Sequence, residues 1–309
     1  MDIDRRSFVK GSAGIVGGLA LGGVSGAQDQ QTIRIGSDIP YKPFEYRTQD
    51  GSLTGFDPAM AEAIFVEEMG MQYEFVDTGF DTIIPSLNNG NFRIIMSAMT
   101  INDQRDQKVD FSEPYFVAYQ TVAILQGSDI STLEDLRGKT IAVQKGTTGE
   151  AAAEELKQQF DGGLTIDSYD QIPGAFNALL NNQAAAVIND NAVNAQYTQE
   201  RDNIVLLQGE GVAAEQGQDA PDYLTLTVEE YGIAFRQDDD EFRQQVNEAL
   251  NAVIGSGRYE EIYREFFPGN PPASILSRAR PAPGTTTMNG TATGNMTGGE
   301  TTTGNATDS

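Results

Sequence analysis

The sequence contains no cysteine and no histidine among its 309 residues. Without cysteine there can be no disulfide, no thiolate nucleophile, no thiolate-bound metal and no lipid-modified cysteine behind an export signal. Without histidine the chain lacks the commonest general base and the commonest metal ligand of proteins. We therefore expect no metal, no cofactor and no catalytic residues.

Positive charge is also scarce. Lys and Arg total 20 against 45 Asp and Glu, which gives a net charge of −25 and a pI near 4.1. A nucleic-acid-binding protein needs clustered basic residues to neutralise phosphates, so we expect no nucleic-acid partner, and an anionic membrane surface is equally unfavourable. The acidic excess could simply keep the surface solvated. Because it spreads over the whole chain, it is more typical of salt-in halophiles, in which molar salt shortens the Debye length to about 3 Å. We therefore expect a haloarchaeal source.

The N-terminus has the features of an export signal. Arg5 and Arg6 precede an uncharged stretch rich in Gly and Ala, and small residues before Gln28 suit signal peptidase cleavage. Residues 1–27 therefore resemble a twin-arginine signal, which predicts a location on the extracytoplasmic face of the membrane or on the cell surface. The alternative is an uncleaved anchor, but the apolar stretch is short for a membrane span.

The C-terminal end changes composition after the last apolar run. From Pro281 onward it consists largely of Thr, Gly, Asn, Ala and Met, which cannot bury enough apolar surface to offset chain entropy. We expect a disordered tail over residues 268–309. Three N-x-T sequons, at Asn289, Asn295 and Asn305, are glycosylation candidates, or the chance product of a composition rich in Asn and Thr.

Between these ends, short β-branched runs alternate with amphipathic helical runs. Strands are predicted at residues 32–36, 71–76, 93–96, 140–144, 164–168, 185–189 and 231–235. Helices are predicted at residues 57–70 with Asp57 as the N-cap, 81–89 with Asp81 as the N-cap, 149–160, 173–181, 239–254 and 258–266, with a capping box at 131–134. Strands alternating with helices of this length favour mainly parallel sheets in two α/β units.

Open α/β sheets bind ligands beyond the carboxyl ends of their strands, so residues that follow strands are the candidates for a site. These residues are Asp38, Tyr41, Phe80, Ser97, Ala98, Thr100, Arg105, Gln144, Thr148, Asn189 and Asp190.

The segments that carry these residues form a recognisable series. They are 38–46 (DIPYKPFEY), 55–57 (GFD), 79–87 (GFDTIIPSL), 99–105 (MTINDQR), 109–115 (VDFSEPY), 144–149 (QKGTTG), 188–190 (IND) and 231–235 (YGIAF). In this order and spacing the chain resembles the family-3 extracellular solute-binding proteins from about residue 32 to 267.

The resemblance implies an α/β, two-lobed, periplasmic-binding-protein-like (type II) fold with a two-crossing hinge. Lobe 1 would comprise residues 32–119 and 231–267, and lobe 2 residues 120–230. It also implies an exported, monomeric substrate-binding protein that closes around a free amino acid and delivers it to an ABC permease and its ATPase. The substrate would be a polar amino acid, basic or glutamine-like.

The resemblance also assigns roles to the site residues. Arg105 would pair with the α-carboxylate, aided by Thr100 and by backbone groups near Ser97 and Thr148. A guanidinium suits that task because it can bind a carboxylate through two hydrogen bonds. Asp190 would bind the α-ammonium, although an aspartate there could equally be a helix N-cap.

The other side of the ligand involves aromatic and acidic residues. Tyr41 and Phe80 would enclose the ligand side chain, and each taken alone could be core packing. Asp38, with Gln144, would contact the far end, where a cationic or amide group is favoured over a second carboxylate. Asn189 and Gly149 depart from residues found in some glutamine and basic-amino-acid binders, which leaves the ligand open.

Two other functions share this fold. One is a cyclohexadienyl or arogenate-type dehydratase, which would need a carboxyl as general acid and no partner for an ammonium group. The other is a sensory amino-acid-binding surface protein.

Overall fold

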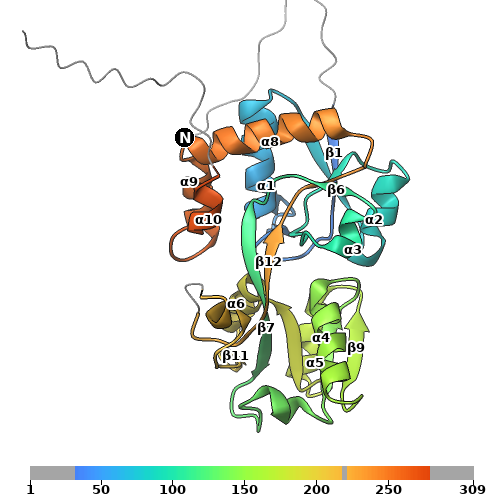
Figure 1. Ribbon diagram of the computed structural model, residues 1–309, viewed down its shortest axis with the longest axis vertical. Coiled ribbons are helices and arrows are strands. Elements are labelled where there is room, and N and C mark those ends of the chain that lie inside the picture. The colour runs from blue at the N-terminus through green and yellow to red at the C-terminus, as the bar shows by residue number, and fades with distance from the viewer. Residues whose placement is uncertain (1–31, 218–220, 279–309) are drawn as a thin grey trace, which may run out of the picture. The chain divides into compact units, whose positions relative to one another are not determined.

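The computed structural model describes residues 32–217 and 221–278 (Figure 1). The expected export signal at 1–27 and the sequons at Asn289, Asn295 and Asn305 lie outside these residues. Within them, two sheets with covering helices form two lobes, as the resemblance implied. No helix in the described part of the chain is long and apolar enough to cross a membrane.

The first lobe is built on a five-stranded sheet with the order β4-β1-β5-β13-β6. Its strands are β1 (Ile33–Ser37), β4 (Tyr73–Asp77), β5 (Ile94–Ile95), β6 (Asp110–Phe111) and β13 (Ala234–Phe235), beside a hairpin of β2 (Tyr46–Arg47) and β3 (Leu53–Thr54). Its helices are α1 (Phe56–Ala61), continued by the π-helix η1 (Glu62–Glu68), then α2 (Phe80–Asn88), α3 (Asp103–Asp106), α8 (Asp240–Gly255), α9 (Arg258–Phe266) and α10 (Ala273–Leu276). Strand β1 pairs in parallel with β4 and β5, whereas β13 is antiparallel to both its neighbours.

The second lobe is built on a six-stranded sheet with the order β11-β7-β10-β8-β9, and β12 also pairs with β7. Its strands are β7 (Phe116–Leu125), β8 (Thr140–Gln144), β9 (Thr165–Tyr169), β10 (Ala186–Asp190), β11 (Ile204–Leu206) and β12 (Thr225–Tyr231). Its helices are the 3-10 helix η2 (Leu133–Leu136), α4 (Thr148–Gln159), α5 (Ile172–Leu180), α6 (Asn191–Glu200) and α7 (Val212–Glu215). Strand β8 runs parallel to β9 and β10, and β7 is antiparallel to β10, β11 and β12.

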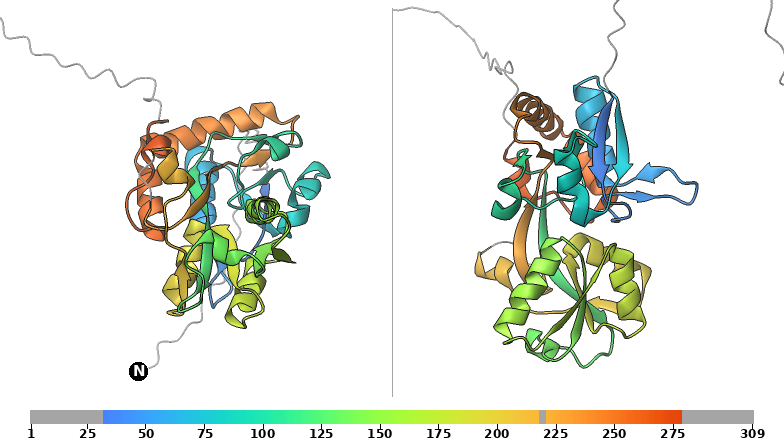
Figure 2. Two further views of the ribbon diagram at one scale, coloured as in Figure 1. Left: turned by 60° about the horizontal axis from the view of Figure 1, so that its bottom comes forward. Right: turned by 90° about the vertical axis from the view of Figure 1, so that its right-hand side faces the viewer.

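Alternation along β8 explains why both faces of the second sheet are covered. Ile141 and Val143 belong to the apolar cluster that includes the buried side of α4. Ala142, between them, belongs to the cluster that includes the buried side of α5. Since successive strand residues point to opposite faces, the two helices pack on opposite sides of the sheet (Figure 2). The carboxyl ends of its parallel strands stay uncovered by these helices.

Two long strands connect the lobes. β7 carries the chain out of the first lobe, and β12 returns it, with antiparallel pairing from Thr225 opposite Thr121 to Tyr231 opposite Phe116 (Figure 1). The lobe boundaries expected between residues 119 and 120 and between 230 and 231 fall within these two strands. Phe116 packs against Phe267 and Phe44 with ring centroids 4.9 and 5.0 Å apart, so the start of β7 is held in an aromatic cluster.

The strand predicted over 231–235 is in fact broken. β12 ends at Tyr231 and β13 begins at Ala234. Between them the backbone leaves its pairing with β7. Gly232 N–H donates to Met99 O at 3.0 Å, and Ile233 N–H donates to Ser112 Oγ at 2.9 Å. Gly232 suits this place because a Cβ would lie 2.9 Å from the Ile101 side chain.

Three predicted helix starts need correction. Gly55, not Asp57, is the N-cap of α1, because the Asp57 carboxylate is buried and accepts hydrogen bonds from Ala98 N and Tyr115 Oη. Gly79, not Asp81, is the N-cap of α2. The capping box lies one residue later than predicted, between Thr132 and Asp135.

The disordered tail expected over residues 268–309 includes a short helix, and its residues 279–309 lie outside the described part of the chain. Residues 273–276 form α10, in which Ile275 is fully buried. Arg278 Nη2 lies 2.7 Å from Glu230 Oε1 on β12. The short run Ser-Ile-Leu contributes apolar surface to the first lobe, and the composition of the following Thr- and Gly-rich residues obscured it.

Candidate functional site

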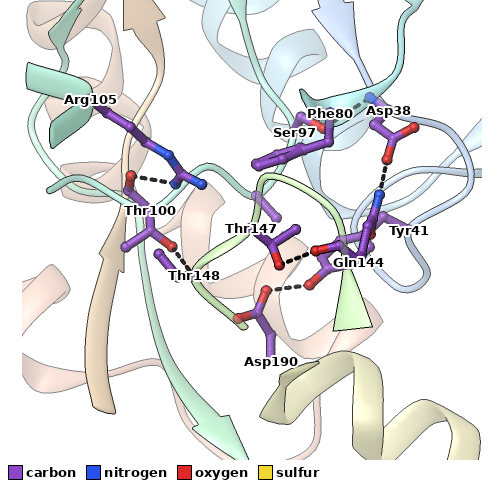
Figure 3. A pocket seen from close by; sticks show the side chains of 11 residues that line it. Asp38, Tyr41, Phe80, Ser97, Thr100, Arg105, Gln144, Thr147, Thr148 and Asp190 are labelled. Atoms are coloured by element: carbon purple, nitrogen blue, oxygen red, sulfur yellow. Dashed lines mark hydrogen bonds between the residues drawn. The ribbon is translucent and has the colours of Figure 1, made fainter. Parts of the chain in front are cut away.

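The ten predicted site residues line one cavity. They are Asp38, Tyr41, Phe80, Ser97, Ala98, Thr100, Arg105, Gln144, Thr148 and Asp190, and Thr147 joins them (Figure 3). Residues from the ends of β1, β5, β8 and β10 meet here, so the cavity lies where the carboxyl ends of the two sheets face each other. The structure thus brings together every site residue that the sequence singled out, apart from Asn189, which lies just behind the cavity.

Arg105 is a buried cation at one end of the cavity. Its backbone is fixed in α3 by the Asn102 side chain, whose Oδ1 accepts from Arg105 N at 2.9 Å. The guanidinium donates to Thr100 O at 2.8 Å and to Gly146 O at 3.3 Å, and it lies 5.2 Å from the centre of the Phe80 ring. Only 8% of the residue is exposed, and no ion pair of the described residues includes it. Burial lowers the pKa of this guanidinium below its ordinary value.

Helix α4 begins beside Arg105. The Thr147 side chain accepts from Glu150 N as an N-cap, and Thr148 is the first helical residue. The N–H groups of a first helical turn have no acceptor within the helix, and they favour an anion there. The guanidinium and this helix end together make one end of the cavity suitable for a carboxylate.

Asp190 is a buried acid on the second lobe. It occupies the N-cap position of α6, but its side chain does not cap the helix. One carboxylate oxygen accepts from the Tyr41 hydroxyl and the other from Gln120 Nε2. Burial, followed by the charge of Glu229, raises the pKa of Asp190 to about 7. No cation of the described residues forms an ion pair with it. The N-cap alternative from the sequence accounts for the position of Asp190 before α6, but its carboxylate bonds to Tyr41 and Gln120 and not to the helix backbone.

Asp38 is the second acid that lines the cavity, on the side away from Arg105 (Figure 3). Its Oδ2 accepts from Gln144 Nε2, whereas its Oδ1 is buried without a hydrogen-bond partner among residues 32–217 and 221–278. Burial raises the pKa of Asp38 to about 6, with a further contribution from Asp77. A carboxylate oxygen without a partner in a buried position is costly unless a ligand supplies a donor.

A further pair of acids lies behind the cavity and holds its wall. Glu45 and Asp57 are fully buried, and burial and their proximity raise the pKa of Glu45 well above its ordinary value. Glu45 Oε1 accepts from Ser97 Oγ at 2.7 Å, and Asp57 Oδ2 accepts from Ala98 N at 2.9 Å. Ser97 Oγ in turn accepts from Asp38 N at 2.9 Å. The acids therefore fix the loop after β5 that forms one wall of the site.

Sequence reasoning missed two polar residues on the connecting strands. Gln120 on β7 and Glu229 on β12 are buried and lie behind Thr148 and Asp190. The sequence signal was a glutamine inside the largely apolar run 116–125. For Glu229 there was no comparable signal, because it is followed by another glutamate, Glu230, that faces outward.

No group of three or more His, Cys, Asp or Glu in the described part of the chain is arranged to hold a metal ion. The cavity instead carries groups of both charges. A guanidinium and the N-terminus of α4 favour an anion, and the carboxyl groups of Asp190 and Asp38 favour cations.

Comparison with known proteins agrees with this geometry. Residues 33–269 match the family described as bacterial extracellular solute-binding proteins, family 3. A "Probable histidine-binding protein" from Neisseria gonorrhoeae is 31% identical over 242 residues, which are 78% of this chain and 85% of that protein.

Two solved structures are similar to the described fold. The arginine-, lysine-, histidine-binding protein ArtJ from Geobacillus stearothermophilus is 34% identical, with a TM-score of 0.69 over 80% of this chain and 100% of that one. The ancestral amino acid-binding protein AncCDT-1, a precursor of cyclohexadienyl dehydratase, is 35% identical, with a TM-score of 0.66 over 76% of this chain and 95% of that one. The family match spans both lobes and every residue of the cavity, and the chain belongs to the family-3 extracellular solute-binding proteins.

Proposed function

We propose that this protein binds a free amino acid with a cationic side chain between its two lobes and performs no chemistry on it. The observation that carries the proposal is the separation of charges in the cavity. Among the described residues, Arg105 is buried without an ion pair at one end, and Asp190 and Asp38 are buried without a cation elsewhere. An α-amino acid with a cationic side chain supplies the three missing partners in one molecule.

The α-carboxylate would lie at Arg105. A guanidinium forms two parallel hydrogen bonds with a carboxylate, and the N-terminus of α4 adds a favourable dipole. The α-ammonium would pair with Asp190, whose neighbours Tyr41 and Gln120 already hold both carboxylate oxygens in place. A ligand with these two groups contacts the first lobe through its carboxylate and the second through its ammonium.

The far end of the ligand would meet Asp38. The buried Oδ1 of Asp38 has no hydrogen-bond partner in the described part of the chain, and Gln144 Nε2 donates to Oδ2. A guanidinium or ammonium supplies both the charge and the donor that this oxygen lacks, whereas the amide of glutamine supplies only the donor. The cationic side chain is therefore the better complement. The names of the relatives, which describe histidine-, arginine- and lysine-binding proteins, support the same ligand class.

Two ion pairs between the lobes support a coupling of ligand binding to lobe closure. Lys145 Nζ lies 2.9 Å from Asp81 Oδ2, and Lys42 Nζ lies 2.6 Å from Glu200 Oε1. Each pair joins one lobe to the other, so it exists only when the lobes are close. A ligand that bridges Arg105 and Asp190 would favour this closed arrangement, because it interacts more strongly with it than with an open one.

We further propose that residues 1–27 direct twin-arginine export, that the protein works in high salt outside the cytoplasm, and that an ABC permease with its ATPase receives the ligand. The family description supports an extracellular location. The net charge of −25 supports a halophilic environment. The name of a relative, ABC transporter arginine-binding protein 1 of Escherichia coli, supports an importer as the receiving partner.

The dehydratase alternative is less well supported by the site. Such an enzyme needs a general acid and no ammonium partner, whereas Arg105 and Asp190 line one cavity and supply partners for both the carboxylate and the ammonium of an amino acid. The likeness to a precursor of a cyclohexadienyl dehydratase concerns a protein that is itself described as amino-acid-binding.

A ligand screen tests the proposed function. The full chain is heated in molar salt with each of the twenty amino acids, and the unfolding midpoint is compared with that of the free protein. A ligand at 100 times its dissociation constant adds about 2.7 kcal/mol to the free energy of unfolding. We expect arginine or lysine to raise the midpoint most, and glutamine less. No shift with any amino acid, confirmed by calorimetry, would reject the proposal, and turnover of arogenate or prephenate would favour the enzyme.

A further inference from the structure

Two adjacent glutamates on β12 point in opposite directions. Glu230 is half-exposed and pairs with Arg278 at 2.7 Å on the outside of the fold. Glu229 is 7% exposed and points toward the rear of the cavity. It does not line the cavity itself but contacts residues that do. The buried member of the pair has no assigned role, and the exposed member offers a matched control.

The Glu229 carboxylate is held by side chains from both lobes. Its Oε2 accepts from Thr100 Oγ1 at 2.6 Å and from Thr148 Oγ1 at 2.8 Å. Its Oε1 accepts from Thr227 Oγ1 at 2.7 Å. Thr100 belongs to the first lobe and Thr148 to the second, so a single carboxylate oxygen on a connecting strand ties the two lobes together directly behind the ligand cavity.

These bonds decide what the two threonines can offer a ligand. A hydroxyl carries one proton and two lone pairs. When that proton is donated to Glu229, only lone pairs remain for the cavity, and both threonines line it. The two hydroxyl oxygens lie 3.3 Å apart, and that of Thr148 also accepts from Gln120 Nε2 at 3.1 Å, which leaves Thr100 as the less occupied acceptor. Such a hydroxyl can accept from an ammonium group, but it cannot donate to a carboxylate. The side chain of Thr100 is then unsuited to the carboxylate-binding role that the resemblance implied for it.

The charge of Glu229 acts in the same direction. Gln120 Nε2 donates to Asp190 Oδ1 and lies 3.4 Å from Glu229 Oε2, so one amide bridges the two carboxyl groups. The same Nε2 lies 3.1 Å from Thr148 Oγ1. Two acids and two hydroxyl acceptors therefore lie between Arg105, where the α-carboxylate would bind, and Asp190, where the adjoining α-ammonium would bind (Figure 3).

We infer that Glu229 is a positioning residue for the ligand's α-ammonium group, because it orients the hydroxyls of Thr100 and Thr148 as acceptors and adds negative charge beside Asp190. The inference rests on the proposed function. Glu229 lies on a connecting strand, Thr100 in the first lobe and Thr148 in the second. The ammonium is therefore bound fully only when closure brings both threonines to Glu229.

The test compares two ligands that differ only in the group concerned. L-Arginine carries the α-ammonium, and 5-guanidinopentanoic acid has the same carboxylate and guanidinium without it. Dissociation constants are measured by calorimetry for the parent, for Glu229→Gln and for the control Glu230→Gln. We expect Glu229→Gln to weaken L-arginine binding by roughly tenfold or more and to change binding of the deamino ligand less than about threefold. Glu230→Gln should leave both ligands unaffected.

A second variant guards against a general disturbance of the site. Thr148→Ala removes one hydroxyl and should also weaken L-arginine more than the deamino ligand. If that hydroxyl donates to the carboxylate instead, both ligands lose affinity equally. Equal losses for the two ligands in both variants would overturn the inference while leaving amino-acid binding intact. Failure of the parent to bind L-arginine or any other amino acid would instead reject the proposed function on which the inference rests.

Discussion

The hydroxyl of Tyr41, in the lobe built on β1, donates a hydrogen bond to the carboxylate of Asp190, in the lobe built on β10, across 149 positions of sequence. The acid proposed to bind the ligand's ammonium is thus held by the opposite lobe. A similar bond joins Gln144 Nε2 to Asp38. Residues of the site therefore also make the contacts between the lobes, which couples ligand recognition to closure.

Replacement of Arg105 should remove the partner of the ligand carboxylate. Arg105→Ala leaves that carboxylate buried without a counter-charge, a loss of about 2–5 kcal/mol, or roughly 30-fold or more in affinity. Arg34→Ala is the control, because Arg34 lies on the surface and pairs with the exposed Glu74. Calorimetry with the best ligand of the screen measures both. Unchanged affinity in Arg105→Ala would mean that the ligand is not held as an amino-acid zwitterion.

Asp38→Asn should distinguish a cationic ligand from an amide. The substitution keeps the shape of the side chain and some hydrogen bonding but removes its charge. Binding of arginine or lysine should fall by roughly 30-fold or more, because a buried cation loses its partner, whereas binding of glutamine should weaken only modestly. Asp167→Asn, on an exposed residue of β9, is the control. Equal effects on arginine and glutamine would contradict a charge contact at Asp38.

Affinity for a cationic amino acid should rise with pH. Burial raises the pKa of Asp190 to about 7 and of Asp38 to about 6, against an ordinary value of about 3.9. Between about pH 4 and 7 the ligand-free folded protein holds more protons than the unfolded chain, so its free energy of unfolding falls as pH rises through that range. A cationic ligand favours the ionised carboxylates and must displace these protons.

We therefore expect the dissociation constant for L-arginine to decrease at least tenfold from pH 5 to pH 8 and to level off above about pH 7. Calorimetry in two buffers with different ionisation enthalpies should detect proton release on binding near pH 6. Asp190→Asn should reduce that release. An affinity that does not vary with pH, with no proton release, would show that both acids are already ionised in the free protein.

Gly146 should be required for closure. It has φ +76°, and a Cβ there would lie 2.9 Å from the Cα of Asp81 in the opposite lobe. Gly138 has φ +75° in the same lobe and nothing within 4 Å of such a Cβ. Gly146→Ala and Gly138→Ala thus introduce similar backbone strain, but only the first obstructs the approach of the lobes. We expect a roughly tenfold loss of affinity for Gly146→Ala alone; similar affinities in the two variants would contradict an obstruction.

The net charge predicts a dependence on salt. At about 50 mM salt the Debye length is several times longer than in molar salt, so repulsion among the excess acidic residues is much less screened. We expect the cooperative thermal transition to weaken or disappear on dialysis from molar to about 50 mM salt, and to return when salt is restored. Circular dichroism against temperature measures this. A cooperative transition at the same temperature in low salt would remove the halophilic interpretation.

The sequence alone supplied the class of fold and the residues of the cavity. Strand 140–144 and helix 258–266 agree with β8 and α9 residue for residue, since their periodicity and flanking signals are local. The site residues could be named because they follow strands in a parallel α/β pattern and match motifs of a known family. The helix start at Asp57 failed for a non-local reason: its carboxylate bonds with Ala98 and Tyr115, far along the chain.

Other features depended on the tertiary structure. Glu229 and Glu230 are chemically identical neighbours on one strand, and only the pairing of β12 with β7 decides which of them is buried behind the cavity. Burial and partners far along the chain also create the contact of Gln120 with Asp190, leave one oxygen of Asp38 without a partner among the described residues, and raise the pKa of Asp190. Local patterns can specify a strand and the residue at its end. Which polar groups then meet, and which are left without a partner, depends on how two distant parts of the chain pack together.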